Sequence, residues 1–468
     1  MKKTILLSML AGFIFINNSC RKIEVDGGTT VTPPPGGTEN TILSGRITTD
    51  RTLSAANVYT LRDLVYVTNG ATLTIEAGTK IVGEKSTRGA LIVTRGCKLI
   101  ANGAADKPIV FTSDQGANSQ RGDWAGIVLL GRARTNASYN GSVGLGEAEG
   151  GINNGEGLGL YGGTDDDDNS GSMKYVRIEY AGYAFLPDKE LNGLSLYAIG
   201  RGTTLQYIEV SYSNDDSFEW FGGTVNVDHI IAYKGLDDDQ DSDNGFSGNV
   251  QFVISQRDSS VADISGSNGW ESDNDANGLS TVNVNQPQTK AVWSNVTLIG
   301  PRATSANTGN SLFRNGAQIR RNSSISIFNS VMLGWPVGVY IDATTGGPTD
   351  LNIVNNTLLI QNTIVAGCTV PLKFGASTTT PTGWDLTELT RWFNTPAYGN
   401  SILANSSDVQ LTDAFNQTGN PDFTPQPGSP LLSGASFANA KIASGFTVVT
   451  YRGAVGPADT WWKGWTKF

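Results

Sequence analysis

The sequence has little histidine, little cysteine and little charge. Among 468 residues there are one histidine and three cysteines, and charged residues make up 16%. The histidine, His229, lies inside the strand-like segment DHIIAY, aligned with Tyr207 and Phe252 of related segments, and is predicted to be a packed strand residue. This placement argues against a Ser-His-Asp triad. The net charge is −10, and Lys and Arg are not clustered, so nucleic acid is not expected as a partner.

The sequence also lacks any apolar run long enough to span a bilayer. The segment ILLSMLAGFIFI (5–16) follows Lys2 and Lys3 and is followed by NNSC (17–20). A short apolar run with a basic start is typical of an export signal.

A cysteine directly after that run resembles the lipobox of bacterial lipoproteins and predicts lipidation of Cys20, although Asn17 stands where the box has an aliphatic residue. The predicted organisation is a signal peptide (1–19), a lipid-anchored flexible linker (20–40), which is rich in Gly, Thr and Pro, and one folded domain (41–468). An ordinary secreted protein and an uncleaved anchor are the alternatives. We expect a monomer attached to the outer membrane or cell surface through its lipid anchor.

Cysteine pairing is open. After removal of the lipidated residue, Cys97 and Cys368 remain, with no CxxC motif and no zinc spacing. Each lies beside an apolar strand pattern. They are either two buried free thiols or one long-range disulfide, which an exported location would allow.

Glycine is abundant, with 57 residues, and short β-prone segments recur along the chain. This is the composition of a turn-rich, all-β protein. Val67 and Val93 occupy equivalent positions at an offset of 26. Two further sets of repeats are KYVRIEY (174–180), QYIEVSY (206–212), DHIIAYK (228–234) and QFVISQR (251–257), at offsets of 32, 22 and 23, and NVTLIG (295–300), NSVMLG (329–334), NTIVAG (362–367) and NSILAN (400–405), at offsets of 34, 33 and 38.

These repeats predict a single right-handed parallel β-helix with Gly- and Asp-rich loop insertions. Each repeat would form one coil that buries its inward side chains on the next coil. The Asn before each strand of the second set suits a left-handed corner. A β-propeller is disfavoured because its blade signatures are absent.

Several long motifs resemble a widespread family of bacterial β-helix lipoproteins with the pectin-lyase-like fold. The resemblance covers about residues 41–468 and implies that fold and export. It implies no established activity and no catalytic residue. The motifs are EGLGLYGGTDDDDNSGSMKYVRIEYAG (156–182), DDSFEWFGGTVN (215–226), DDDQDSDNGFSGNVQF (237–252), GSNGWESDNDANG (266–278), FRNGAQIRRN (313–322), GWPVGVYID (334–342) and YRGAVGPADTWWKGWTKF (451–468).

Acidic residues recur with the coil spacing. Glu219 and Asp241 are 22 residues apart, the offset between successive coils, so the carboxylates of two coils are expected to converge on one edge. Such a group needs a counter-charge, and calcium accepts six to eight oxygen ligands. We therefore predict a calcium site that departs from the EF-hand pattern, since Gly245 comes one position late. The predicted ligands are Asp215, Asp216, Glu219, Asp237, Asp238, Asp239, Asp241 and Asp243.

Two alternatives to this metal site stay open. The acids could form a hydrated turn in which Asp side chains cap backbone amides, or a catalytic carboxylate group. A second acidic run, Asp165 to Asp168, is a weaker metal candidate that could equally be a plain loop.

Aromatic residues alternate with these acids and suggest a groove for glycan, because sugar rings stack on exposed aromatic faces while acids bind hydroxyls. The predicted ligand-binding residues are Trp220, Phe221, Trp270, Glu271, Asp273 and Asp275. Packing of these rings beneath the turns is the alternative. The C-terminal segment Trp461–Trp465 is expected to cap the last open coil.

No complete catalytic set is present. A β-helix polysaccharide lyase would need a basic residue, for which Lys234 and Arg257 are candidates, but the neighbouring acids are expected to raise the pKa of Lys234. A glycoside hydrolase could use Asp215 and Asp216, but its other motifs are missing. The leading hypothesis is a non-enzymatic, calcium-binding module for extracellular glycan or another polymer. The alternatives are a calcium-assisted lyase or hydrolase and an accessory partner of an outer-membrane complex.

Overall fold

The computed structural model describes residues 40–186, 189–275, 285–302, 309–378 and 381–468. The predicted signal peptide, the lipidation of Cys20 and the linker up to residue 39 lie outside the described residues and stay predictions. No helix in the described ranges is long and apolar enough to cross a bilayer. Asn40–Phe468 forms one compact unit.

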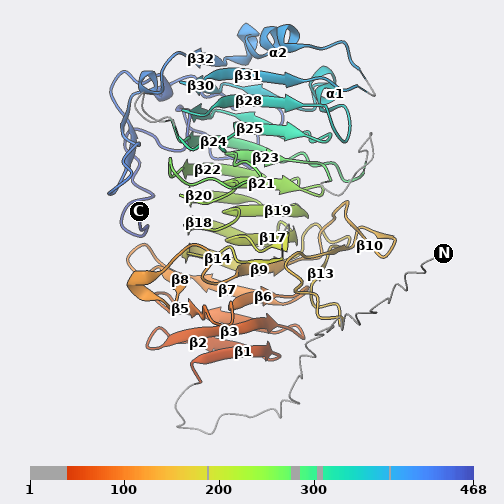
Figure 1. Cartoon of the computed structure of the whole chain (residues 1–468), viewed down its shortest axis with the longest axis vertical. Coiled ribbons are helices and arrows are strands. Elements are labelled where there is room, and N and C mark those ends of the chain that lie inside the picture. The colour runs from red at the N-terminus through yellow and green to blue at the C-terminus, as the bar shows by residue number, and fades with distance from the viewer. Residues whose placement is uncertain (1–39, 187–188, 276–284, 303–308, 379–380) are drawn as a thin grey trace, which may run out of the picture. The chain divides into compact units, whose positions relative to one another are not determined.

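This unit is a parallel β-helix. Over the described ranges its main sheet has 26 strands, and each strand pairs in parallel with the equivalent strand of the next coil (Figure 1). The strands form three faces, numbered so that each coil from β2 onward passes through the first, second and third face in turn. Because every inward side chain packs on its equivalents in neighbouring coils, the core is one column of apolar residues along the stack.

The strands of each face are as follows. The first face contains β2 (Arg51–Leu53), β4 (Thr72–Ile75), β7 (Lys98–Asn102), the first parts of β14 (Gly171–Glu179), β18 (Thr204–Ser211), β20 (Val227–Tyr233), β22 (Asn249–Gln256) and β24 (Val292–Ile299), then β26 (Ser326–Phe328) and β29 (Ile360–Gln361). The second contains the first parts of β1 (Ile42–Ile47) and β3 (Val58–Val67), then β5 (Lys80–Gly83), β8 (Ile109–Ser113), the second parts of β14 to β24, β27 (Val331–Leu333), β30 (Ile364–Ala366) and β32 (Ser401–Leu403). The third contains the second parts of β1 and β3, then β6 (Ala90–Val93), β9 (Gly126–Leu130), β17 (Leu194–Ile199), β19 (Phe218–Gly223), β21 (Gln240–Asp243), β23 (Trp270–Ser272), β25 (Asn315–Arg320), β28 (Val337–Asp342) and β31 (Val370–Gly375).

Short elements fill the loops. The two-stranded pairs are β10 (Ser138–Tyr139) with β11 (Ser142–Val143), β12 (Gly146–Glu147) with β13 (Leu160–Tyr161), β15 (Ala184–Leu186) with β16 (Lys189–Glu190), and β33 (Leu411–Asp413) with β34 (Asp422–Pro425). The helices are α1 (Thr349–Val354), α2 (Leu386–Phe393) and the short 3-10 turns Gly116–Asn118, Pro396–Tyr398, Ser406–Val409 and Pro430–Leu432.

The predicted repeat register is confirmed with one change. Val67 pairs with Val93, and the offsets of 32, 22 and 23 in the first repeat set match the pairs along β14, β18, β20 and β22. The offsets of 34 and 33 in the second set also hold. The final offset is 37 rather than 38, because Ile364 pairs with Ser401. The Asn-based alignment missed this shift of one residue.

Left-handed residues form the corner between the first and second faces. Tyr175, Tyr207, His229 and Phe252 take this conformation and stack their rings, with centroids 4.5 Å apart for Tyr207 and His229. Asn residues occupy the same corner in the later coils: Asn295, Asn329 and Asn362. Asn tolerates positive φ better than most residues, as predicted from the repeats. His229 is therefore a stacked corner residue of its strand, as expected.

The ends of the stack differ from the prediction. Helix α2 lies beyond β31 (Figure 1), its N-cap Asp385 accepts a hydrogen bond from the Glu388 amide at 3.0 Å, and Leu389, Trp392 and Phe393 join the main core. The predicted capping role of the C-terminal tryptophans is wrong, because this apolar helix already covers the core at that end.

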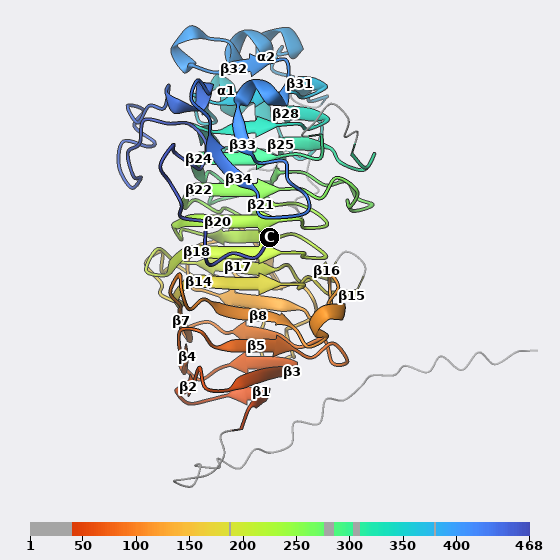
Figure 2. The same cartoon turned by 90° about the vertical axis from the view of Figure 1, so that its left-hand side faces the viewer.

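The C-terminal segment instead returns along the flank of the helix. Trp461 packs edge-on against His229 at a centroid distance of 5.0 Å, and Trp465 packs against Tyr175 at 5.6 Å. Figure 2 shows the C-terminus beside β18 and β20, in the middle of the stack. The Lys467 amide donates to the buried carboxylate of Glu209 at 2.9 Å, which fixes the end of the chain there.

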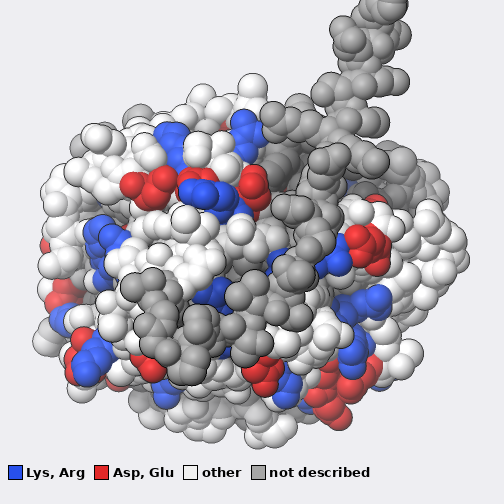
Figure 3. Space-filling model, turned by 90° about the horizontal axis from the view of Figure 1, so that it is seen from below, with Lys and Arg blue, Asp and Glu red and all other residues white. Residues whose placement is uncertain are grey.

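Two smaller predictions concern cysteine and charge. Cys97 and Cys368 are both free, which resolves the open alternative in favour of thiols. Seen from below, the molecule shows Lys and Arg interspersed with Asp and Glu, without an extended basic patch on that face (Figure 3).

Candidate metal site and groove

The acidic residues lie on the third face, where strand alternation sends every second side chain outward. In β19, Phe218 and Trp220 enter the core while Glu219 points out. Glu219 pairs with Asp241, as the offset of 22 predicts, and Asp241 pairs with Glu271. The same outward row continues through later coils with Gln318, Tyr340 and Lys373.

A second row lies in the turns that lead into these strands, and its side chains bind backbone. Asp216 accepts a hydrogen bond from the Asp238 amide at 2.8 Å, Asp238 accepts from the Asn268 amide, and Asn268 accepts from the Asn315 amide at 3.1 Å. Each residue thus caps the next coil. The alternative in which Asp side chains cap backbone amides is therefore confirmed for Asp216 and Asp238. Asp216 caps the amide through Oδ1, and its other carboxylate oxygen, Oδ2, does not take part.

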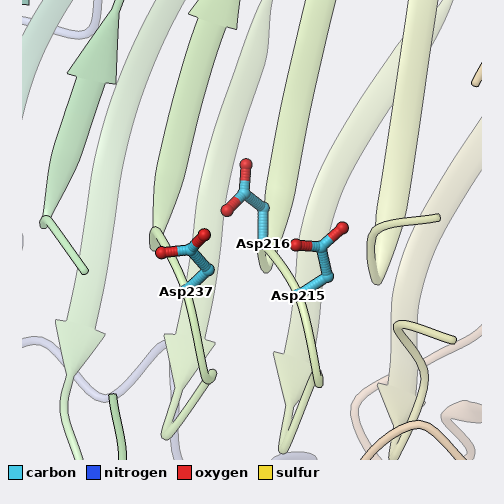
Figure 4. A group of neighbouring side chains, drawn as sticks. All are labelled: Asp215, Asp216 and Asp237. Atoms are coloured by element: carbon cyan, nitrogen blue, oxygen red, sulfur yellow. The ribbon is translucent and has the colours of Figure 1, made fainter. Parts of the chain in front are cut away.

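The two rows bring carboxylates into three overlapping groups. They are Asp215, Asp216 and Asp237; Asp216, Glu219 and Asp241; and Asp238, Asp241 and Glu271. Within each group the possible ligand atoms lie within 4.8 Å of one another. Figure 4 shows the first group, with Asp215 and Asp216 on one turn and Asp237 on the next.

Arginines neutralise only part of the acidic edge. Arg257 forms a fully buried ion pair with Asp239 at 2.8 Å. Arg320 binds both Glu271 and Asp273, at 2.6 and 2.8 Å, and Arg321 also binds Asp273. In the part of the chain that the structure describes, no ion pair reaches Asp215, Asp216, Glu219, Asp237, Asp238, Asp241 or Asp243.

Two predicted ligands lie outside the three groups. Asp239 is held by Arg257, and Asp243 accepts a hydrogen bond from the Asp273 amide at 3.1 Å. The expectation of eight carboxylates in one site is corrected to six of them plus Glu271, which had been assigned to a glycan. Asp239 precedes β21 and is held by Arg257, and Asp243 ends β21 beside the Asp273 amide, so neither joins a group with Asp241.

Burial of these acids disfavours their charged forms. It is the main cause that raises the pKa of Asp237 to about 7, and of Asp238 and Glu271 to about 8. Burial, followed by repulsion from neighbouring carboxylates, raises the pKa values of Asp216 and Asp241 well above the ordinary range. The same holds for Asp215, Glu219 and Asp243. The edge therefore needs protons or a cation at neutral pH.

The aromatic residues predicted to stack on sugars are core residues. Trp220 and Trp270 are completely buried inside the helix. Phe221 is 4% exposed and stacks on Tyr197 at a centroid distance of 4.1 Å. The glycan-stacking expectation for these three residues is therefore corrected to packing. Of the acids predicted beside them, Asp273 is ion-paired, and Asp275 accepts a hydrogen bond from Asn285.

The predicted bases do not serve the acidic edge. Lys234 donates through Nζ to the Gln417 carbonyl at 2.6 Å, and burial lowers its pKa, the opposite of the expected shift. Arg257 is enclosed by its ion pair with Asp239. In the second acidic run, Asp166 pairs with Arg134 and Arg201, and Asp167 pairs with Arg201. This run contributes no member to the three carboxylate groups found in the described residues.

A groove of about 660 Å³ adjoins the acidic edge. Asp237, Asp238 and Glu271 lie among its lining residues, together with Arg314 and Lys373, which carry the opposite charge. Its floor includes Gln318 and Tyr340 from the outward row. Sequence reasoning missed this groove because its basic residues come from distant loops and coils. An alignment of the third-face strands would have placed Glu271, Gln318, Tyr340 and Lys373 in one row.

The fold and this edge define a parallel β-helix protein with a buried acidic row that opens into a groove of mixed charge. Residues 45–411 match the family model of the pectate-lyase-like beta helix domain, and the chain belongs to that family. The match confirms the predicted resemblance and fold. No curated protein and no solved structure matches the chain.

Proposed function

We propose that the protein is an exported, lipid-anchored β-helix module that binds calcium and holds an extracellular glycan or another polymer without cleaving it. The observation that carries the proposal is the environment of Asp241. Its carboxylate belongs to two of the three acidic groups, and its buried Oδ1 has no hydrogen-bond partner in the described structure. A buried, unpaired carboxylate oxygen is costly unless a cation or a proton satisfies it.

The spacing of the acids is compatible with calcium. Calcium–oxygen distances of about 2.3–2.6 Å allow two ligands of one ion to lie up to about 5 Å apart, whereas magnesium at about 2.1 Å allows roughly 4 Å. The ligand atoms in each group lie within 4.8 Å of one another. The ligands are oxygens from carboxylates, which calcium prefers.

The binding role is supported by the placement of the two residues that were predicted as bases. Both predicted bases, Lys234 and Arg257, are held by partners elsewhere. The Asp216 and Asp238 carboxylates cap backbone amides of neighbouring coils, which fixes their orientation. These contacts support a rigid cation site rather than acids poised for proton transfer to a substrate.

Calorimetric titration of the full mature chain with calcium tests the metal site. We expect heat of binding for the wild type, at least tenfold weaker affinity for Asp241→Asn, and no change for Asp106→Asn, an exposed acid remote from the edge. Absence of heat up to millimolar calcium would refute the site. Incubation with uronate-rich polysaccharides tests the rest, because unsaturated or reducing ends would contradict a non-enzymatic role.

A further inference from the structure

The C-terminal residues cover a buried glutamate on the outer side of β18 (Figure 2). Ile208 and Val210 enter the core, so Glu209 between them points outward, yet it is completely buried. The Lys467 amide donates to both of its carboxylate oxygens, at 2.9 and 3.3 Å. We propose that residues 466–468 form a latch whose docking depends on a proton: the latch is closed while Glu209 is protonated and opens when Glu209 ionises.

No cation forms an ion pair with Glu209 in the described ranges. Arg177 lies opposite Glu209 on β14, but its Nε pairs with Glu179 at 2.9 Å. Lys467 Nζ also lies beside Glu179, at 3.7 Å. Ile231, the partner of Glu209 on β20, is apolar. A buried carboxylate that accepts from one amide and has no ion pair is more stable as the neutral acid.

The groups around Glu209 act in both directions, and burial outweighs them. Burial is the main cause that raises the pKa of Glu209 from 4.5 to about 8; the Lys467 amide and the charges of Arg177 and Lys467 oppose that rise, and Glu179 adds to it. Burial also raises the pKa values of two tyrosines that interact electrostatically with Glu209, so both stay neutral where Glu209 titrates. The titratable groups that face it are Arg177 and Glu179 from β14, Tyr212 directly after β18, Tyr233 from β20 and Lys467 from the latch.

Opening of the latch gives water access to the carboxylate. Phe468 packs edge-on against Tyr233 at a centroid distance of 4.9 Å, and Lys467 supplies the amide that Glu209 accepts. Upstream of the latch, Trp465 is 1% exposed and its carbonyl accepts from Arg177 at 3.3 Å, so Trp465 stays docked when the latch opens. Ionisation of Glu209 is costly only while the latch covers it. Loss of the proton and opening of the latch are therefore coupled.

The sign and size of the pH effect follow from this coupling. With the latch open, Glu209 takes its ordinary pKa of 4.5, and with the latch closed its pKa is about 8. Below about pH 4.5 Glu209 is protonated in both states, so docking has its full strength. As the pH rises from about 4.5 to 8, docking weakens because only the open state holds the charged carboxylate in water. Between pH 6 and pH 9 the equilibrium constant for docking should fall roughly a hundredfold.

Amide hydrogen exchange of residues 466–468 tests the latch. The full mature chain and Glu209→Gln are compared at pH 6 and pH 9 in constant calcium. Each wild-type rate is divided by the variant's rate at the same pH, which cancels the intrinsic pH dependence of exchange. We expect this ratio to rise by up to roughly a hundredfold from pH 6 to pH 9. Glu147→Gln, at an exposed glutamate of β12, is the matched control and should exchange as the wild type does.

Truncation after Thr466 gives a second test that does not depend on glutamine at position 209. It removes Lys467 and Phe468, so the wild type should be more stable than the truncated chain in urea at pH 6, and that difference should shrink at pH 9. An exchange ratio that is the same at both pH values, or a stability difference that persists undiminished at pH 9, would overturn the proton-dependent latch.

Discussion

The acidic edge predicts an unusual dependence of stability on pH, which calcium reverses. The folded-state pKa values of Asp237, Asp238 and Glu271, about 7, 8 and 8, lie above the ordinary values of 3.8 for Asp and 4.5 for Glu. Below about pH 4 these groups are protonated in both states, so they contribute no difference. As the pH rises from about 4 to 8, only the unfolded chain releases its protons, so stability is lost over that window.

The expected change in the free energy of unfolding follows from the distances between the carboxylates. Two unit charges 4.8 Å apart, the upper limit on ligand-atom separations within an acidic group, repel by roughly 3.5 kcal/mol at an effective dielectric constant of about 20. Asp241→Asn removes this repulsion to the extent that the groups are ionised, and should stabilise the calcium-free protein by up to roughly 3 kcal/mol at pH 8. Calcium at about 100 times its dissociation constant should stabilise the wild type by about 2.7 kcal/mol.

Urea denaturation at pH 5 and pH 8, in chelator and in calcium, measures these differences in the free energy of unfolding. In chelator at pH 8 the variant should be more stable than the wild type, and calcium should reduce that difference because it binds the wild type at least tenfold more tightly. At pH 5 calcium should have little effect because protons occupy the edge. A calcium-free wild type that is equally stable at both pH values, or an Asp241→Asn variant that is less stable in chelator, would refute the reasoning. Asp106→Asn should follow the wild type throughout.

Three further changes test the scaffold. Arg257→Met should destabilise the protein by about 3–5 kcal/mol in urea melts, because it leaves the fully buried Asp239 unpaired, and adding Asp239→Asn should recover much of the loss. Trp392→Ala should cost about 3–5 kcal/mol by the same assay, since it opens the cap formed by α2, while Leu386→Ala at an exposed position of that helix should cost little. Truncation after Thr460 removes the buried Trp462 and Trp465 and should cost roughly 4–6 kcal/mol, with a lower thermal midpoint; an unchanged midpoint would contradict the docking of the C-terminal segment.

Part of the site could be predicted from the sequence, and one of the wrong predictions about it could have been avoided. The coil offset placed Glu219 beside Asp241 without any structure. The same alternation, once Glu219 points outward, requires Trp220 to point inward, so the burial of that ring follows from its position. The glycan prediction relied on aromatic and acidic residues that are adjacent in the sequence. Adjacent residues in a strand point to opposite sides, so these rings and acids cannot share a surface.

The sequence by itself determined the β-helix, its register and the gathering of acids on one edge. Stacked coils repeat the same local pattern, so equivalent positions in neighbouring repeats must lie side by side. Only the tertiary structure decided which acids form an ion pair with an arginine and which do not in the described ranges. Arg257 lies 18 residues from Asp239, and Arg320 lies 47 residues from Asp273. Neither separation matches the repeat offsets of 22 to 38 found in the sequence, because the loops between these residues differ in length. The same holds for the groove and the C-terminal segment, since loops and termini have no repeat to constrain where they dock.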